Sequence, residues 1–246
     1  MLNEFFILTC SSALLLGIGF VSACGAGPCP PADNEQWDES RRQMVGVLRG
    51  YGIQDERLLS VMERIPRHLF IPEPLRSHTN AYGDHPCPIG NGQTISQPFI
   101  VAYMTEKLGI KPGDKILEIG TGSGYQAAVL AGMGARVYSV ELIPALVAHA
   151  KGVLSRLGYA GRVKVRLGDG YKGWPEEAPF DAVIVTCAPE DIPEALVAQL
   201  KEGGTMIVPA GSWMSQRLVV LHKNKGRIEK TDDLPVRFVP MVHPGP

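Results

Sequence analysis

Three glycines on alternate positions, Gly120, Gly122 and Gly124, constrain the fold of this chain more than any other feature. The segment Lys115–Ile119 before them is mostly apolar, and Tyr125–Met133 after them is compatible with a helix. This order predicts a buried strand, a tight turn without Cβ atoms, and a helix whose first N–H groups face the turn. Such a turn lets the backbone approach a nucleotide-like ligand closely; a strand–turn–helix unit without a ligand is the simpler alternative.

The spacing of the glycines and one carboxylate indicate the kind of ligand. A dinucleotide-binding G-x-G-x-x-G turn would need its third glycine at position 125, where this chain has Tyr125. Glu118 lies two positions before the first glycine, where it would repel a pyrophosphate and attract a cation. The pattern E-x-G-x-G-x-G resembles motif I of the S-adenosyl-L-methionine-dependent methyltransferases. This resemblance implies that Glu118 and the three glycines bind that sulfonium cofactor.

Strands and helices alternate regularly after the turn, which predicts an α/β fold with a Rossmann-like, doubly wound and mostly parallel sheet. A later polar stretch and turn, Asn224–Gly226, separate two apolar segments without a helix, so an antiparallel pair should close the C-terminal edge. Two amphipathic helices precede the sheet as a small N-terminal helical region. The expected strands are Arg136–Glu141, Val163–Leu167, Phe180–Cys187, Thr205–Pro209, Arg217–His222 and Val236–Met241, and the expected helices are Glu35–Leu48, Asp55–Ile65, Pro144–Leu157 and Ile192–Leu200.

The segment Tyr82–Pro98 shows neither a helix period nor a strand period. Long segments of this kind inside compact domains are usually functional loops. A short helix is expected from Thr105 to about Gly109, directly before the central strand.

Acidic residues at two strand ends are further candidates for binding the cofactor. Glu141 ends a strand about twenty residues after the turn, where a carboxylate can accept hydrogen bonds from ribose hydroxyls. Asp169 and Gly170 follow the next strand at the same sheet edge, and Asp169 could accept from an adenine amino group or cap the next turn. Asp181 is expected to fix the start of its strand, whose carboxyl end would form the floor of the cleft.

Several longer motifs resemble the bacterial protein-L-isoaspartate O-methyltransferases over about residues 44–242. They are R-I-P-R-H-L-F-I-P-E, D-H-P-C-P-I-G-N-G-Q-T-I-S-Q-P, L-E-I-G-T-G-S-G-Y-Q-A-A-V-L-A, G-D-G-Y-K-G-W-P-E-E-A-P-F-D-A and V-R-F-V-P-M. Two positions depart from the usual family pattern, Cys87 and Cys187, and Cys187 is expected to be a small core residue. The resemblance implies that Ser96 is the active-site serine and that the loop with Thr94, Ile95 and Gln97 lies over the cofactor.

The same resemblance implies methyl esterification of the free carboxylate of L-isoaspartyl residues, which initiates their repair to aspartyl residues. The nucleophile would be an α-carboxylate with an ordinary pKa near ~3.5, so no general base is needed. No G-x-S-x-G elbow surrounds Ser96, so it is not expected to be a triad nucleophile. Two alternatives remain open: a methyltransferase of the same fold acting on a small molecule or RNA, and a non-catalytic membrane-tethered binding module.

Composition sets the remaining expectations. A net charge of −1 over 246 residues gives no broad attraction for nucleic acid. Five scattered cysteines without paired C-x-x-C spacing indicate neither a disulfide framework nor a metal site. The expected partners are isoaspartyl proteins and peptides, and the expected state is a monomer.

The N-terminus leaves the localisation open. Residues 1–24 form a hydrophobic segment ending in V-S-A-C, which resembles a lipoprotein signal with Cys24 as the lipidated residue. Its first residues contain Glu4 and no Lys or Arg, contrary to a normal signal peptide. A misassigned start and a simple anchor are equally open. Residues 25–34 are expected to be a linker and residues 35–246 a methyltransferase domain, placed in the cytoplasm where its cofactor is made.

Overall fold

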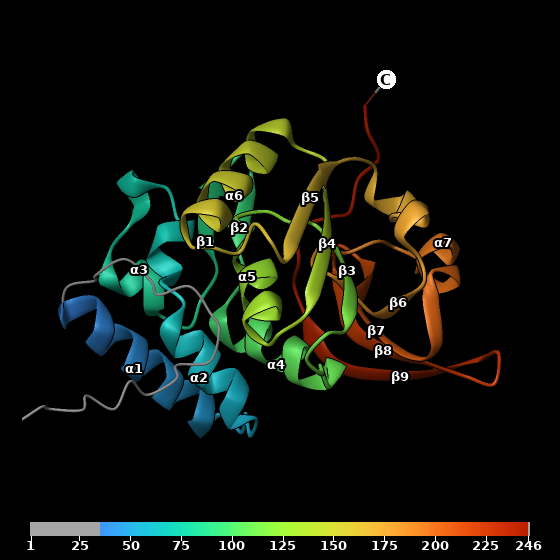
Figure 1. Cartoon of the computed structure of the whole chain (residues 1–246), viewed down its shortest axis with the longest axis horizontal. Coiled ribbons are helices and arrows are strands. Elements are labelled where there is room, and N and C mark those ends of the chain that lie inside the picture. Colours follow the sequence, from blue (N-terminus) through green and yellow to red (C-terminus); the bar gives the residue numbers. More distant parts are fainter. Residues whose placement is uncertain (1–34, 246) are drawn as a thin grey trace, which may run out of the picture.

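A seven-stranded sheet forms the centre of the computed structural model, which describes residues 35–245 (Figure 1). Its strand order is β5-β4-β3-β6-β7-β8-β9. The first five strands in this order run parallel, and β8 and β9 pair antiparallel at one edge. The strands are β3 (Lys115–Ile119), β4 (Arg136–Glu141), β5 (Val163–Leu167), β6 (Phe180–Val185), β7 (Leu200–Ser212), β8 (Ser215–Asn224) and β9 (Arg227–Val236). The predicted fold class is confirmed.

Helices cover both faces of the sheet because its strands are apolar on both sides. Ile116 of β3 packs into one core cluster with the helices α4 (Pro98–Leu108), α5 (Tyr125–Gly132) and α6 (Pro144–Arg156). Leu117 and Ile119, on the opposite face, pack with α7 (Glu194–Ala198) and the strands around it. Figure 1 shows α7 on the far side of the sheet from α5. Burial on two faces is what a doubly wound sheet requires.

The N-terminal helical region packs against this core from the side of α4 and α5 (Figure 1). It contains α1 (Glu35–Gly50), α2 (Glu56–Arg64) and α3 (His78–Tyr82), with the short 3₁₀ helices η1 (Arg67–Phe70) and η2 (Glu73–Leu75) between them. Asp55 caps α2 by accepting from the N–H groups of Arg57 and Leu58. Two further 3₁₀ turns, η3 (Gly170–Lys172) and η4 (Pro175–Glu177), follow β5.

Three predictions of secondary structure were wrong. The segment 82–98 contains an antiparallel hairpin of β1 (Cys87–Gly90) and β2 (Gln93–Ile95), whose strands are too short to show a period. The helix expected from Thr105 is α4, which begins at Pro98, where proline suits the first turn. The second strand of the C-terminal pair is β9, which starts directly after the Asn224–Gly226 turn, in the polar stretch. Because an exposed edge strand needs no alternation of apolar residues, the sequence of β9 contains no hydrophobic pattern that would predict a strand.

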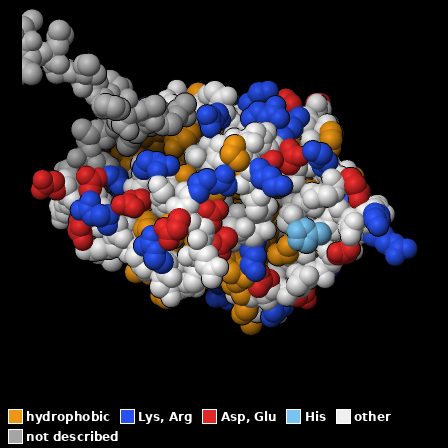
Figure 2. Space-filling model, turned by 60° about the horizontal axis from the view of Figure 1, so that its bottom comes forward, with side chains coloured by type: hydrophobic (Ala, Val, Ile, Leu, Met, Phe, Trp, Pro, Cys, Tyr) orange, Lys and Arg blue, Asp and Glu red, His pale blue; other side chains and the backbone are white. Residues whose placement is uncertain are grey.

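The hydrophobic segment 1–24, the linker 25–34 and Cys24 lie outside the described residues. Within residues 35–245, no helix has the length and apolar character that would carry it through a bilayer. On the face drawn in Figure 2, Lys and Arg side chains are interspersed with Asp and Glu, in keeping with the net charge of −1.

Candidate active site

The glycine turn follows β3 and has the conformation that only glycine adopts easily. Gly120, Gly122 and Gly124 have φ values of +93°, +53° and +89°. A Cβ atom at Gly120 would lie 2.6 Å from Oγ1 of Thr186 at the end of the adjacent strand β6. The positive φ values and the close approach of a second strand end together explain why glycine is needed here.

Glu141 at the end of β4 ties this turn to the next loop. Its Oε2 accepts a hydrogen bond of 2.8 Å from the N–H of Gly122, and its Oε1 accepts one of 2.9 Å from the N–H of Ile143. The side chain is largely buried but borders the cavity beside the turn. A carboxylate has about four lone-pair positions, so two such bonds leave acceptor capacity toward the cavity.

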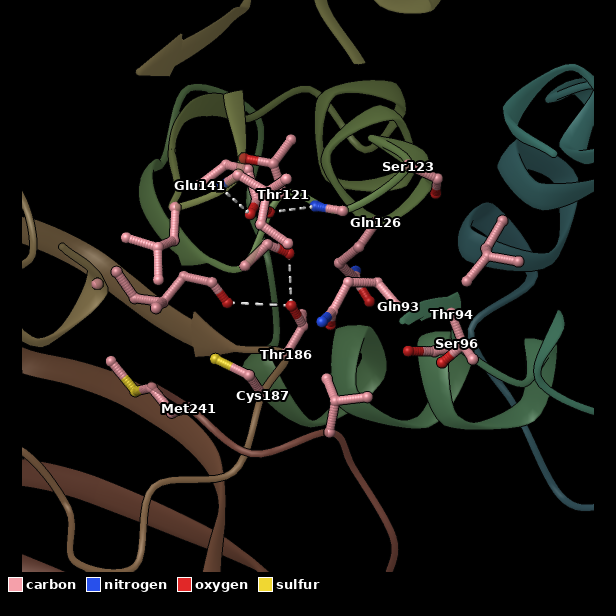
Figure 3. Close-up of a pocket in the computed structure, with 18 of the residues that line it drawn as sticks. Gln93, Thr94, Ser96, Thr121, Ser123, Gln126, Glu141, Thr186, Cys187 and Met241 are labelled. Atoms are coloured by element: carbon pink, nitrogen blue, oxygen red, sulfur yellow. Dashed lines mark hydrogen bonds between the residues drawn. The ribbon is translucent and has the colours of Figure 1, made fainter. Parts of the chain in front are cut away.

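The cavity lies across the carboxyl ends of β3, β4 and β6, where the strand order of the sheet reverses (Figure 3). This is the position at which open α/β sheets bind their ligands. The glycine turn, the β1–β2 hairpin region, α5 and the end of β6 contribute polar groups, and the C-terminal segment contributes apolar ones. The lining residues are Gln93–Ser96, Val101, Ile119–Ser123, Tyr125, Gln126, Val140–Ile143, Gly170, Thr186, Cys187 and Val239–Val242.

Glu118 does not line this cavity. It is fully buried beneath the turn, where its Oε2 accepts a hydrogen bond of 2.5 Å from Oγ of Ser139. That hydroxyl lies 2.5 Å from Oγ1 of Thr121, which does border the cavity. Burial, together with the charge of Glu141, raises the pKa of Glu118 to about 8. A buried carboxyl that favours its protonated form differs from the cation-attracting carboxylate expected from the motif, and its hydrogen bonds connect it to the cavity through Ser139 and Thr121.

Ser96 lies directly after β2 and its backbone is held by a buried arginine. Nη2 of Arg67 donates a hydrogen bond of 2.9 Å to the carbonyl oxygen of Ser96, and its Nε donates to Ala81. The Arg67 side chain is fully buried and lies over the ring of Tyr125. The position of Ser96 is therefore set by the N-terminal region, which supplies Arg67, and not by the hairpin alone.

The residue after Ser96 points elsewhere. Nε2 of Gln97 donates a hydrogen bond of 2.7 Å to Asp84, which also accepts from the N–H of Phe99 at 2.8 Å. Gln97 borders a second groove and is absent from the lining of the cavity, whereas Thr94 and Ile95 line the cavity. Asp84 thus fixes the chain where the loop passes into α4.

Ser96 lies where the cavity and the second groove meet. The second groove runs between α4 and a stretch made of the end of β9 and the segment after it, and it shares Thr94, Ser96, Thr186 and Val239 with the cavity. In Figure 3, Thr94 and Ser96 lie together on one side of the cavity, and Met241 lies on the other. A ligand in the cavity and a second one in the groove would come together at Ser96.

Asp169, Gly170 and Gly124 take different places relative to the cavity. Gly170 lines it, and a Cβ there would lie 2.6 Å from Ile119, so the backbone packs closely against β3. Asp169 caps η3 by accepting from Tyr171 N–H at 3.0 Å, and it does not line the cavity. Gly124 packs against α6, where a Cβ would lie 3.2 Å from Ala150, so its role is to bring α5 and α6 together.

The C-terminal segment was missed as part of the site. Val239–Val242 were expected to belong mainly to an edge strand, but they cross the mouth of the cavity. Hydrogen bonds of 2.8 Å connect Ala188 N–H to the Val239 carbonyl and Met241 N–H to the Ala188 carbonyl. The V-R-F-V-P-M motif was the available signal, although only the fold shows that it returns to β6.

The strand β6 ends at Val185, two residues earlier than the expected end at Cys187. Cys187 lies two residues past the strand; it is half-buried, packs against the core on the α7 side of the sheet as expected, and also lines the cavity. Burial raises the pKa of its thiol to about 12, so the thiol is neutral. Asp181 accepts from Lys115 N–H at 2.9 Å and from Nζ of Lys201 at 2.7 Å, which confirms that it fixes the start of the strand.

The parallel sheet, the alternating glycine turn and the cavity at its switch point define the class of S-adenosyl-L-methionine-dependent methyltransferases. Residues 39–244 match the family model of protein-L-isoaspartate(D-aspartate) O-methyltransferase. The chain belongs to this family. It is 54% identical over 200 residues to the protein-L-isoaspartate O-methyltransferase of Gloeobacter violaceus, covering 81% of this chain and 96% of that one. It is 50% identical over 203 residues to that of Methanoculleus marisnigri, covering 82% and 91%.

Solved structures agree with the family match. A protein-L-isoaspartate O-methyltransferase superimposes with a TM-score of 0.75 at 32% identity, covering 81% of this chain and 65% of that one. A related protein from Plasmodium falciparum, described as a putative enzyme of this kind in complex with S-adenosyl-L-homocysteine, gives a TM-score of 0.74 at 27% identity. This superposition covers 82% of this chain and 98% of the Plasmodium falciparum chain.

Proposed function

We propose that this chain uses S-adenosyl-L-methionine to methylate the free carboxylate of L-isoaspartyl residues in damaged proteins and peptides, the first step of their repair to aspartyl residues. The observation that carries the proposal is the position of Ser96 at the junction of the cavity and the groove. The family match supplies the kind of substrate. This support favours isoaspartyl chains over a small molecule or RNA.

The residues around the cavity suit this cofactor. The glycine turn leaves no room for a Cβ at Gly120, so the backbone can face an amino acid end closely. Glu141 retains acceptor capacity for ribose hydroxyls. Val140, Leu142 and Ile143 provide apolar contacts for a purine ring. We therefore assign the cofactor to Glu141, Gly120, Gly122, Gly170, Thr94 and Ile95. Glu118, Asp169, Gly124 and Gln97 then act through these groups.

The bound cofactor supplies an electrophilic methyl group on its sulfonium. The protein holds the incoming carboxylate at Ser96, whose hydroxyl can donate a hydrogen bond to one of the carboxylate oxygens. No group on the protein needs to remove a proton, because the substrate carboxylate is ionised well below neutral pH. Alignment of the reactants is therefore the main contribution of Ser96 and Arg67, and such positioning can supply up to about 7–11 kcal/mol of a barrier.

The proposal is tested with the purified full chain, labelled S-adenosyl-L-methionine and a pair of peptides that differ only in an isoaspartyl or aspartyl residue. We expect methylation of the isoaspartyl peptide and little of its isomer. The isomers differ in which carboxylate is free and in one backbone methylene, so only the geometry at Ser96 can separate them. Equal methylation of both peptides, or of neither, contradicts the proposal.

The remaining assignments are part of the same proposal. Residues 35–246 act as one methyltransferase domain, in monomeric form, in the cytoplasm. The cytoplasmic assignment is supported by the cofactor, which is made and used there. Mass analysis of the mature N-terminus from fractionated cells tests it, because a diacylated Cys24 as first residue would place the domain outside the cytoplasm.

A further inference from the structure

The groove beside Ser96 is largely apolar and carries a single charge. Of the described residues that line it, Arg237 is the only one with a charged side chain. The others are mainly aliphatic, aromatic or proline residues from α4, from the end of β9 and from the segment that follows it. They are Pro86, Thr94, Ser96, Gln97, Phe99, Ile100, Thr186, Leu234, Pro235, Val236, Phe238 and Val239. A lone cation in an apolar groove predicts recognition of one anionic group at a defined place.

Arg237 is exposed and rests on an aromatic ring. Its guanidinium carbon lies 5.3 Å from the ring centroid of Trp213. Trp213 and Met214 form the two-residue turn between β7 and β8, and they are 54% and 85% exposed. The ring orients the guanidinium without neutralising it, because a cation–π contact leaves the N–H donors free for a carboxylate. The turn thereby adds exposed apolar surface next to the charge.

The distance along the chain places this charge close to the reacting position. Val239, like Ser96, lines both the cavity and the groove, and Arg237 is two residues before Val239. Two residues span at most about 7 Å. An extended peptide rises about 3.3 Å per residue. The backbone of Arg237 therefore lies about two peptide residues from the junction, so its side chain can meet a substrate residue about two positions from the isoaspartyl residue.

We propose that Arg237, held on Trp213, binds the side-chain carboxylate of an acidic residue that flanks the isoaspartyl residue of the substrate. The proposal rests on the proposed function, because it assumes that the peptide extends from Ser96 along the groove. It assigns a sequence preference to this enzyme: peptides with Glu about two positions from the isoaspartyl residue are favoured over peptides with Gln there. The apolar lining of the groove, which includes Phe99, suits the aliphatic part of that side chain.

The preference is measured with full-length protein and two series of isoaspartyl peptides. One series carries Glu or Gln two positions before the isoaspartyl residue, and the other carries them two positions after it. In one series we expect kcat/KM to be about threefold to fivefold higher for Glu than for Gln, as for an exposed ion pair of up to about 1 kcal/mol. The ratio should fall with added salt, because exposed charges are screened.

Substitutions distinguish recognition of the acidic residue by Arg237 from general effects on catalysis. Arg237→Gln should bring the Glu/Gln ratio close to one, whereas Arg237→Lys should keep part of it, since the charge remains. Arg227→Gln is the matched control, because it removes an exposed arginine from the opposite end of the β8–β9 hairpin and should leave the ratio unchanged. Equal rates for Glu and Gln in both series of the wild-type enzyme, or a ratio that survives Arg237→Gln, would overturn the subsite. If no isoaspartyl peptide is methylated, the proposed function itself fails.

Discussion

Replacing Glu118 by glutamine should make the folded protein less sensitive to rising pH. Glu118 is completely buried, and among the described residues its Oε1 has no hydrogen-bond partner. Its Oε2 accepts from Ser139, which helps the anion but does not compensate for burial. The protonated form is therefore favoured in the folded state, and glutamine resembles that form in shape and polarity without being able to ionise.

The sign and size of the effect follow from the two pKa values. The folded pKa is raised to about 8 from an ordinary value of 4.5, so the unfolded chain ionises first as pH rises. The folded state then holds one more proton between these values, and the free energy of unfolding falls by about 1.36 kcal/mol for each pH unit. Between pH 5.5 and 7.5 this amounts to about 2.5 kcal/mol, which the glutamine variant should not lose.

The measurement is urea unfolding of both proteins at several pH values across this range. The stability of wild type relative to Glu118→Gln should decrease steadily toward pH 7.5. Glu73→Gln, in the exposed 3₁₀ turn η2, controls for loss of a carboxyl group as such. Parallel curves for wild type and Glu118→Gln would refute the reasoning, because they would mean that Glu118 titrates alike in both states.

Three further substitutions test the site, and a fourth, on the surface, serves as a control. Glu141→Gln should weaken binding of S-adenosyl-L-methionine by about 1.5–3 kcal/mol, as for hydrogen bonds to a charged acceptor; calorimetry that finds wild-type affinity in a folded variant removes Glu141 from the site. Ser96→Ala should lower kcat with little change in cofactor affinity, because the hydroxyl aligns the attack; steady-state kinetics unchanged from wild type contradict its role. Gly120→Ala should destabilise the fold, because its Cβ would collide with Thr186, whereas Gly152→Ala on the open surface of α6 should stabilise by about 0.5–1 kcal/mol; thermal melts that rank the two variants in the opposite order contradict this.

Local patterns were sufficient for the elements that are buried on both faces or regularly amphipathic. The bounds of β4 and β5 were predicted to the residue, and α6 to within one residue. These segments have a strong apolar pattern and clear ends, such as Pro144 at the start of α6. Patterning failed where a strand is short or has a solvated edge, as for the β1–β2 hairpin and β9. There the hydrogen-bond partner, not the side chains, decides that the segment is a strand.

The amino-acid sequence by itself determined the glycine turn, the succession of strands and helices along the chain, and the position of Glu141 at a strand end. Each of these depends on residues close together in the chain. Only the tertiary structure decided which groups surround the reacting position. Arg67 reaches the carbonyl of Ser96 from 29 residues away, and Val239 comes to the same place from the C-terminal segment. It also decided that Glu118 faces Ser139 under the turn and does not line the cavity. Long-range packing fixes these neighbours, since strand alternation allows either face and only the buried partner selects one.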